Sequence, residues 1–243
     1  MSNLHPGTTG SLRLPAALTL ALGLLLLLGA GFTTAADGRM DAHSAASLPT
    51  KIYVQGDSLT VDSSTVFKSL AKPSLVTLDA KSGRHAYEGI ARMRKVKSFP
   101  DAVVVALGTN DDYNAYGVAL FKSHVQSAMG LFGTKRCVVW VNLFQARTAK
   151  QIKAKVPMIF TGMNALLASI ESRTPTFHVV DWAKMSGYHP EWYRYDSVHP
   201  TDAGYLARAK AIIAALKTCG TRSGGGVTPI GSPDGGGGSP GPS

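Results

Sequence analysis

The chain has 243 residues, of which 44% are hydrophobic and 16% are charged, which is typical of a globular protein with one sizeable domain and shorter extra segments. Its formal net charge of +10 would attract it to anionic surfaces such as wall polymers or lipid headgroups. The alternative is a basic surface that binds no such partner. The lysines and arginines are scattered and no nucleic-acid-binding motif is recognisable, which argues against a nucleic-acid partner.

The first 36 residues are expected to direct export. Leu14 to Ala36 carries no charge and includes the run LTLALGLLLLLGAGF, Arg13 precedes it, and the small residues TTAA end it. A basic residue, an apolar core and a small-residue cleavage site, in that order, predict a secretory signal peptide. An uncleaved membrane anchor is the alternative, because the apolar stretch approaches the roughly 20 residues that span a bilayer. In either case the rest of the chain leaves the cytoplasm.

Two further segments flank the part of the chain that can fold. Residues 37–49 are interpreted as a spacer, and residues 221–243, dominated by glycine, proline and serine, as a disordered tail. The folded domain is therefore expected over residues 50–220. It holds both cysteines, Cys137 and Cys219, and in an exported chain an even number permits a disulfide. Two buried free thiols are the alternative.

Within this domain, short apolar runs alternate with longer mixed segments that are compatible with helices. The runs are rich in β-branched residues and are continuous rather than alternating, which indicates strands buried on both faces of a parallel sheet. Strands are expected over residues 51–55, 74–79, 101–108, 136–144 and 176–182, and helices over residues 58–71, 86–97, 117–132, 156–172 and 202–217. This order predicts an α/β fold, a three-layer α/β/α sandwich.

Polar turns follow the strands or precede the last helix at four places. They are GDSL with Ser58, KSGRHAYEG with Gly83, GTND with Asn110, and DSVHP with Asp196 and His199. In parallel sheets, ligands bind outside the carboxyl ends of the strands. Because those ends share one edge of the sheet, the four turns are expected to meet there.

The residue types at these turns are those of nucleophilic catalysis. A serine hydroxyl such as that of Ser58 needs a base to take its proton, and His199 could act as that base if Asp196 holds its ring. Attack on an acyl carbon produces an oxyanion that requires hydrogen-bond donors. The candidates are the backbone N–H groups of Ser58 and Gly83 and the side-chain amide of Asn110. A glycine suits such a position because it has no Cβ to keep the substrate away.

The four turns, in this order, resemble the four blocks of the SGNH/GDSL hydrolase family, which is named for Ser, Gly, Asn and His. The resemblance covers residues 50–217 and implies a flavodoxin-like fold without a metal or cofactor. It implies a catalytic triad of Ser58, His199 and Asp196 and an oxyanion hole formed by Ser58, Gly83 and Asn110. The stretch LDAKSGRHAYEGI also resembles SGNH domains linked to O-acetylation of cell-wall or other polysaccharides.

Each of these residues also has a purely structural interpretation. Ser58 could cap the following helix, since serine is a favoured cap. Asn110 could form a turn, and His199 could be a surface residue before a proline. Arg84, beside the glycine of the second block, could contact an anionic group of the substrate, but it is expected to be solvated.

An aromatic segment, DWAKMSGYHPEWYRYD, precedes the last block. Its rings could form a wall that stacks on sugars or faces an acyl group, or they could cover the core under a long loop. They are Trp182, Tyr188, Trp192, Tyr193 and Tyr195.

The sequence therefore predicts an exported serine esterase that hydrolyses a carboxylic ester, with a short acyl group such as acetyl on a glycan as the first expectation. An O-acyltransferase with the same site and a sugar acceptor is the first alternative, and a non-catalytic glycan- or wall-binding module is the second. The expected partners are an acylated glycan or lipid and an anionic cell-surface polymer. The oligomeric state is left open.

Overall fold

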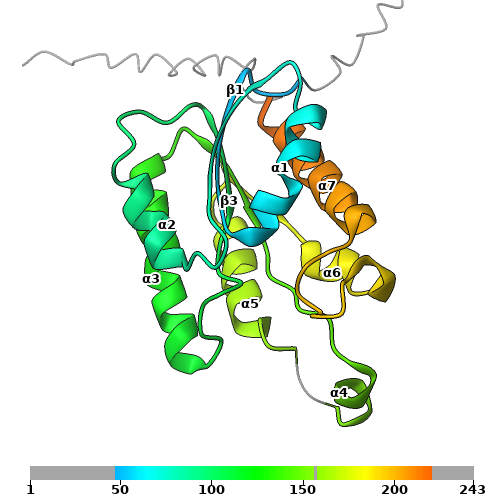
Figure 1. The fold of residues 1–243 in the computed structure, drawn as a ribbon. Coiled ribbons are helices and arrows are strands. Elements are labelled where there is room, and N and C mark those ends of the chain that lie inside the picture. The colour runs from blue at the N-terminus through cyan, green and yellow to red at the C-terminus, as the bar shows by residue number, and fades with distance from the viewer. Residues whose placement is uncertain (1–46, 156–157, 221–243) are drawn as a thin grey trace, which may run out of the picture. The chain divides into compact units, whose positions relative to one another are not determined.

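A five-stranded parallel sheet forms the centre of the computed structural model, which describes residues 47–155 and 158–220 (Figure 1). The strands lie in the order β2-β1-β3-β4-β5, and every neighbouring pair is parallel. They are β1 (Lys51–Gly56), β2 (Leu75–Ala80), β3 (Ala102–Ala106), β4 (Cys137–Val141) and β5 (Phe177–Val180). The predicted α/β class with a parallel sheet of five strands is confirmed.

Helices cover both faces of the sheet. The longer ones are α1 (Ser58–Leu70), α2 (Ala86–Met93), α3 (Ala115–Phe132), α5 (Thr161–Glu171) and α7 (Asp202–Gly220). Short helices are α4 (Ala149–Lys153), α6 (Trp182–Ser186) and the 3-10 turn η1 (Pro190–Trp192). Helices α2, α3 and α5 lie on one side of the sheet, and α1 and α7 lie side by side on the other (Figure 1).

The two faces of the sheet form two apolar cores. In β3, Val103 and Val105 point into the core under α2, α3 and α5, whereas Ala102, Val104 and Ala106 point into the core under α1 and α7. All five residues of the strand are buried. This burial on both faces explains why the strand is continuously apolar instead of alternating.

Several element boundaries differ from the sequence prediction. Helix α2 ends at Met93 rather than at residue 97, because the N–H groups of Lys95 and Val96 donate three residues back, as in a tighter 3-10 turn. Strand β5 ends at Val180, since the Asp181 carboxylate accepts the N–H of Lys184 and starts α6. Helix α5 begins at Thr161 rather than at residue 156.

Helix α4 was not predicted, although the sequence carries a signal for it. Thr148 and Gln151 form a capping box in which the Thr148 hydroxyl accepts the N–H of Gln151 at 3.2 Å. The glutamine side chain in turn accepts the N–H of Thr148 at 2.8 Å. A threonine followed three residues later by glutamine is a recognised start of a helix.

The proposed signal peptide or anchor (residues 1–36), most of the spacer and the tail (221–243) lie outside the described residues. Within residues 47–155 and 158–220, no helix combines the length and the apolar character needed to cross a membrane. The domain boundaries at residues 50 and 220 stay predictions.

A disulfide joins Cys137, the first residue of β4, to Cys219 near the end of α7. The two Cα atoms are 5.6 Å apart, and the bridge closes 82 residues of chain. Of the two alternatives for the cysteines, the structure has the bridge, which ties the last helix to the sheet. Closing a loop of this length lowers the entropy of the unfolded chain by an amount worth about 4 kcal/mol.

Replacing both cysteines, as Cys137→Ser/Cys219→Ser, should lower the free energy of unfolding by about 2–5 kcal/mol. Urea unfolding of the variant beside the wild type measures this loss. Reduction of the wild type should give a similar loss, and the variant should not respond to the reductant. Equal stability of variant and oxidised wild type would contradict a stabilising bridge.

Candidate active site

The turn after β1 presents Ser58 as the first residue of α1. The preceding Asp57 is the N-cap, because its carboxylate accepts the N–H of Leu59 at 3.0 Å. The structural interpretation of Ser58 as the cap is therefore wrong. The turn also requires Gly56, since a Cβ there would lie 2.1 Å from the Thr60 hydroxyl. Cap and glycine together hold the serine at the carboxyl edge of the sheet.

Asp57 is buried below the serine, with 1% of its surface exposed. Burial raises the pKa of its carboxyl above the ordinary value, and attraction to the Arg208 guanidinium of α7 opposes that rise. Burial likewise lowers the pKa of Arg208, and attraction to Asp57 opposes the fall. Each charge therefore favours the charged form of the other in the contact region between α1 and α7.

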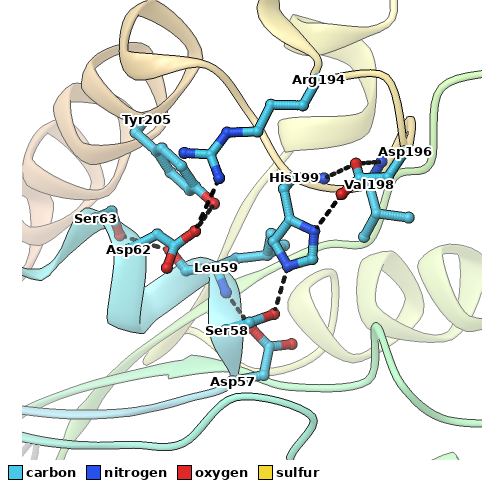
Figure 2. A network of polar contacts seen from close by, with 10 residues as sticks. All are labelled: Asp57, Ser58, Leu59, Asp62, Ser63, Arg194, Asp196, Val198, His199 and Tyr205. Carbon is cyan, nitrogen blue, oxygen red and sulfur yellow. Dashed lines mark hydrogen bonds and ion pairs between the residues drawn. The ribbon is translucent and has the colours of Figure 1, made fainter.

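His199 and Asp196 lie beside Ser58, as Figure 2 shows. The Nε2 atom of His199 is 2.9 Å from the Ser58 Oγ atom, across 141 residues of sequence. On the other side of the ring, Nδ1 is 2.8 Å from the Asp196 Oδ2 atom. The structure thus brings together the three residues that the sequence proposed as a triad.

The contacts also favour one tautomer of the neutral His199 ring. Desolvation raises the pKa of the Asp196 carboxyl. Hydrogen bonds from the N–H groups of His199 and Val198, together with the His199 ring, lower this pKa by a larger amount, so it lies below its ordinary value. An ionised carboxylate only accepts hydrogen bonds, so Nδ1 carries the proton. Nε2 is then the nitrogen that accepts the hydrogen of the Ser58 hydroxyl.

The loop that carries the two residues is held by its own backbone. The N–H of Arg194 donates to the His199 carbonyl at 2.9 Å, and the N–H of Ser197 donates to the Arg194 carbonyl at 2.9 Å. Ser197 has a φ of 62°, a left-handed conformation that costs a non-glycine residue about 1 kcal/mol. Its carbonyl accepts the N–H of Ala146 at 2.8 Å, which anchors this tight turn to the segment after β4.

The three oxyanion-hole candidates lie after β1, β2 and β3. These strands are neighbours in the sheet, with β1 in the middle. At the start of α1, the N–H groups of Leu59, Thr60 and Val61 all donate to Asp57, and that of Ser58 is not among them. The Ser58 N–H lies at the positive end of the helix dipole, where an anion is favoured.

Gly83 and Asn110 stand on the loops that flank the serine. Gly83 has a φ of 71°, which favours glycine. The Asn110 amide donates to the Arg84 carbonyl at 3.1 Å, which ties the two loops together. Since an amide group has two N–H bonds, a second donor remains for a ligand. The Asn110 side chain therefore joins its own loop to that of Gly83, and its role as an oxyanion donor stays a prediction.

Arg84 is buried rather than solvated, so that expectation is wrong. Its guanidinium contacts the Asp79 carboxylate at 2.9 Å and donates to the Asp79 carbonyl at 2.8 Å and the Gly56 carbonyl at 3.4 Å. It thereby links the glycine loop to the end of β1. Asp111 has a related role, because its carboxylate accepts the N–H of Ala86 at 2.9 Å and fixes the start of α2.

A second polar cluster was not predicted from the sequence. The Asp62 carboxylate on α1 accepts the Tyr205 hydroxyl of α7 at 2.9 Å and lies 3.5 Å from the Arg194 guanidinium (Figure 2). Arg194 belongs to the loop that carries the histidine, so this cluster joins that loop to the helix of the serine. Only the spacing of Asp62 one turn after Ser58 could have suggested it.

Three of the five rings in the aromatic segment pack against the core. Trp182 is buried, and Trp192 stacks on it with ring centroids 5.8 Å apart. Tyr193 packs on Phe144 at 5.3 Å. Tyr188 and Tyr195 are instead exposed.

Comparison with known proteins adds a sequence relationship. The O-acetyltransferase OatA of Staphylococcus aureus is 29% identical over 168 residues, which is 67% of this chain and 24% of that protein. The chain thus spans about a quarter of the length of the curated relatives it matches. No protein-family model matches the chain.

Solved structures agree with the architecture. The catalytic domain of peptidoglycan O-acetyltransferase A from Streptococcus pneumoniae superposes with a TM-score of 0.57 and 21% identity, covering 71% of this chain and 94% of that one. A lipase/acylhydrolase from Enterococcus faecalis gives 0.57 and 20%, covering 69% and 95%. With GDSL-like lipases also among its structural neighbours, the chain has the fold of the SGNH/GDSL hydrolases.

Proposed function

We propose that this chain is an exported serine hydrolase that cleaves a carboxylic ester through an acyl-enzyme at Ser58. The observation that carries the proposal is the 2.9 Å contact between the Ser58 hydroxyl and His199 Nε2, with Asp196 on the opposite ring nitrogen. Serine, base and orienting carboxylate in this relation are the arrangement that activates a hydroxyl for acyl transfer.

The reaction follows from these contacts. As the Ser58 oxygen bonds to the ester carbon, its proton passes to His199 Nε2, and the Asp196 carboxylate stabilises the imidazolium. The oxyanion is stabilised by N–H groups from Ser58, Gly83 and Asn110. The imidazolium then gives its proton to the departing alcohol, which leaves an acyl-serine. A water then loses a proton to His199 as it attacks the acyl-serine, and His199 returns that proton to the Ser58 oxygen as the carboxylic acid leaves.

An acetyl group on a glycan is the ester we favour. The similar structure from Streptococcus pneumoniae is described as a peptidoglycan O-acetyltransferase, and the relative from Staphylococcus aureus as an O-acetyltransferase. These names also support the alternative that the acyl-serine is attacked by a sugar hydroxyl instead of water. A non-catalytic glycan- or wall-binding module is disfavoured because every residue type that the reaction needs is present at the site.

Export is part of the proposal. The bridge between Cys137 and Cys219 supports it, since disulfides persist in oxidising compartments. The apolar segment at residues 14–36 is the proposed export signal or anchor. With a net charge of +10, the protein would be retained near anionic cell-surface polymers.

The cluster of Asp62, Tyr205 and Arg194 would serve this reaction by positioning. It joins the helix that begins with Ser58 to the loop that carries His199. Proton transfer requires these two residues to stay within hydrogen-bond reach, and a displacement of about 1 Å can cost two orders of magnitude in rate.

The Ser58→Ala variant should lower kcat/KM for p-nitrophenyl acetate by at least about 10³-fold, because the nucleophile is lost. A fluorophosphonate probe should label the wild type on Ser58, as located by mass spectrometry, and should not label the variant. Thermal unfolding serves as the control for folding. Ester hydrolysis that survives in the variant would contradict the role of Ser58.

Asp62→Ala should lower kcat about tenfold with little change in KM, because the loop of His199 loses its link to α1. Asp62→Glu should recover part of the rate, since it restores the charge. Asp101→Ala is a matched control, because Asp101 is exposed beside the amino end of β3. A kcat for Asp62→Ala equal to that of the control would rule out the positioning role.

Product analysis separates hydrolase from transferase. With p-nitrophenyl acetate as donor, we expect free acetate at the same rate with and without a chito-oligosaccharide, and no acetylated sugar by mass spectrometry. Acetylated sugar, formed at the expense of free acetate, would favour the transferase alternative. Ser58→Ala controls for acetyl transfer that does not need the enzyme.

A further inference from the structure

Most tyrosines of this protein have exposed side chains. Of its eight tyrosines, five are exposed. Their exposed fractions range from 55% to 100%. They are Tyr87, Tyr113, Tyr116, Tyr188 and Tyr195, which are called the tyrosine rim below.

All five follow the carboxyl ends of strands. Tyr87 is the second residue of α2, which follows β2, and Tyr116 is the second residue of α3, which follows β3. Tyr113 lies between β3 and α3, and Tyr188 lies two residues after the end of α6, which follows β5. Tyr195 directly precedes Asp196. The five tyrosines therefore belong to segments that follow the carboxyl edge of the sheet, where Ser58 also lies.

Short contacts connect the rim to the proposed reaction centre. The N–H of Ala86, next to Tyr87, donates to Asp111 at 2.9 Å, one residue from Asn110. On the other side, Tyr188 lines a hollow of about 360 Å³ together with Phe144 and Ala146. The N–H of Ala146 donates to Ser197 in the loop of the histidine at 2.8 Å.

An exposed tyrosine offers two surfaces to a ligand. Its ring has an apolar face and its hydroxyl forms hydrogen bonds, so tyrosine suits places where one end is apolar and the other wet. A pyranose ring has the complementary character, with C–H bonds on its faces and hydroxyls at its edge. Clusters of exposed apolar groups on a soluble protein mark binding sites more often than chance.

We propose that the tyrosine rim is a binding surface for a glycan chain, which it holds across the carboxyl edge by stacking on successive sugar rings. The orientation toward Ser58 rests on the proposed function, whereas the binding itself does not. Because stacking of a sugar on an aromatic ring does not depend on ion pairs, this binding should survive high salt. Binding of an anionic polymer through exposed lysines such as Lys150 and Lys153 would instead be lost at high salt.

The test measures binding of the full chain carrying Ser58→Ala to purified peptidoglycan, by co-sedimentation at 0.05 and 0.5 M NaCl. Combining Tyr116→Ala, Tyr188→Ala and Tyr195→Ala, the three most exposed positions, should raise Kd at least about tenfold at both salt concentrations. Thermal unfolding should be little changed, since exposed side chains are replaced. With Ser58 intact, the same triple variant should show a lower ratio of turnover on acetylated peptidoglycan to turnover on p-nitrophenyl acetate.

The matched control is Leu75→Ala, which removes an exposed apolar side chain from the opposite edge of the sheet, where β2 begins. It should leave Kd unchanged. An unchanged Kd in the triple variant, or binding that disappears at 0.5 M NaCl, would overturn the proposal. If the protein hydrolyses no ester but still binds peptidoglycan through these tyrosines, the tyrosine rim is a glycan site and only the proposed hydrolysis is wrong.

Discussion

The contact between the Ser58 hydroxyl and the His199 ring imposes the main constraint on this molecule. It joins residues 141 positions apart, from the first strand–helix turn and from the loop before the last helix. For the contact to form, α1 and α7 must lie side by side on one face of the sheet (Figure 1). The apolar side chains of these helices share one core with β1, β3 and β4, so packing of that core contributes to the separation of the serine hydroxyl and the histidine ring.

Polar contacts further fix the positions of α1 and of the loops next to it. Asp57 fixes the start of the serine helix, and Arg208 of α7 compensates its buried charge. Asp62 links the same helix to the loop of the histidine. On the other side of the serine, the buried guanidinium of Arg84 holds the glycine loop against the end of β1. Charged groups thus hold two separate loops, that of the histidine and that of Gly83, next to the start of α1.

Much of this could be predicted from the sequence. The continuously apolar runs identified all five strands, and parallel strands place the polar turns that follow them at one edge. Ser58, Gly83 and Asn110 were proposed in that way, and Asp196 and His199 were proposed from the polar turn before the last helix. The sequence could not show that Arg84 is buried or that Asp62 meets Tyr205, because these contacts join side chains of distant elements. Helix α4 was missed for a different reason, since five residues are too few for a periodic pattern and only its capping box marks it.

The bridge between Cys137 and Cys219 fixes the place at which α7 ends relative to the sheet. Cys137 opens β4, so Cys219 and the end of α7 lie at the amino edge of the sheet, where β1 also begins. Both covalent connections of the domain to the rest of the chain therefore depart from the side opposite Ser58. A tether attached at either end of the domain would therefore start at the edge of the sheet that lies away from Ser58.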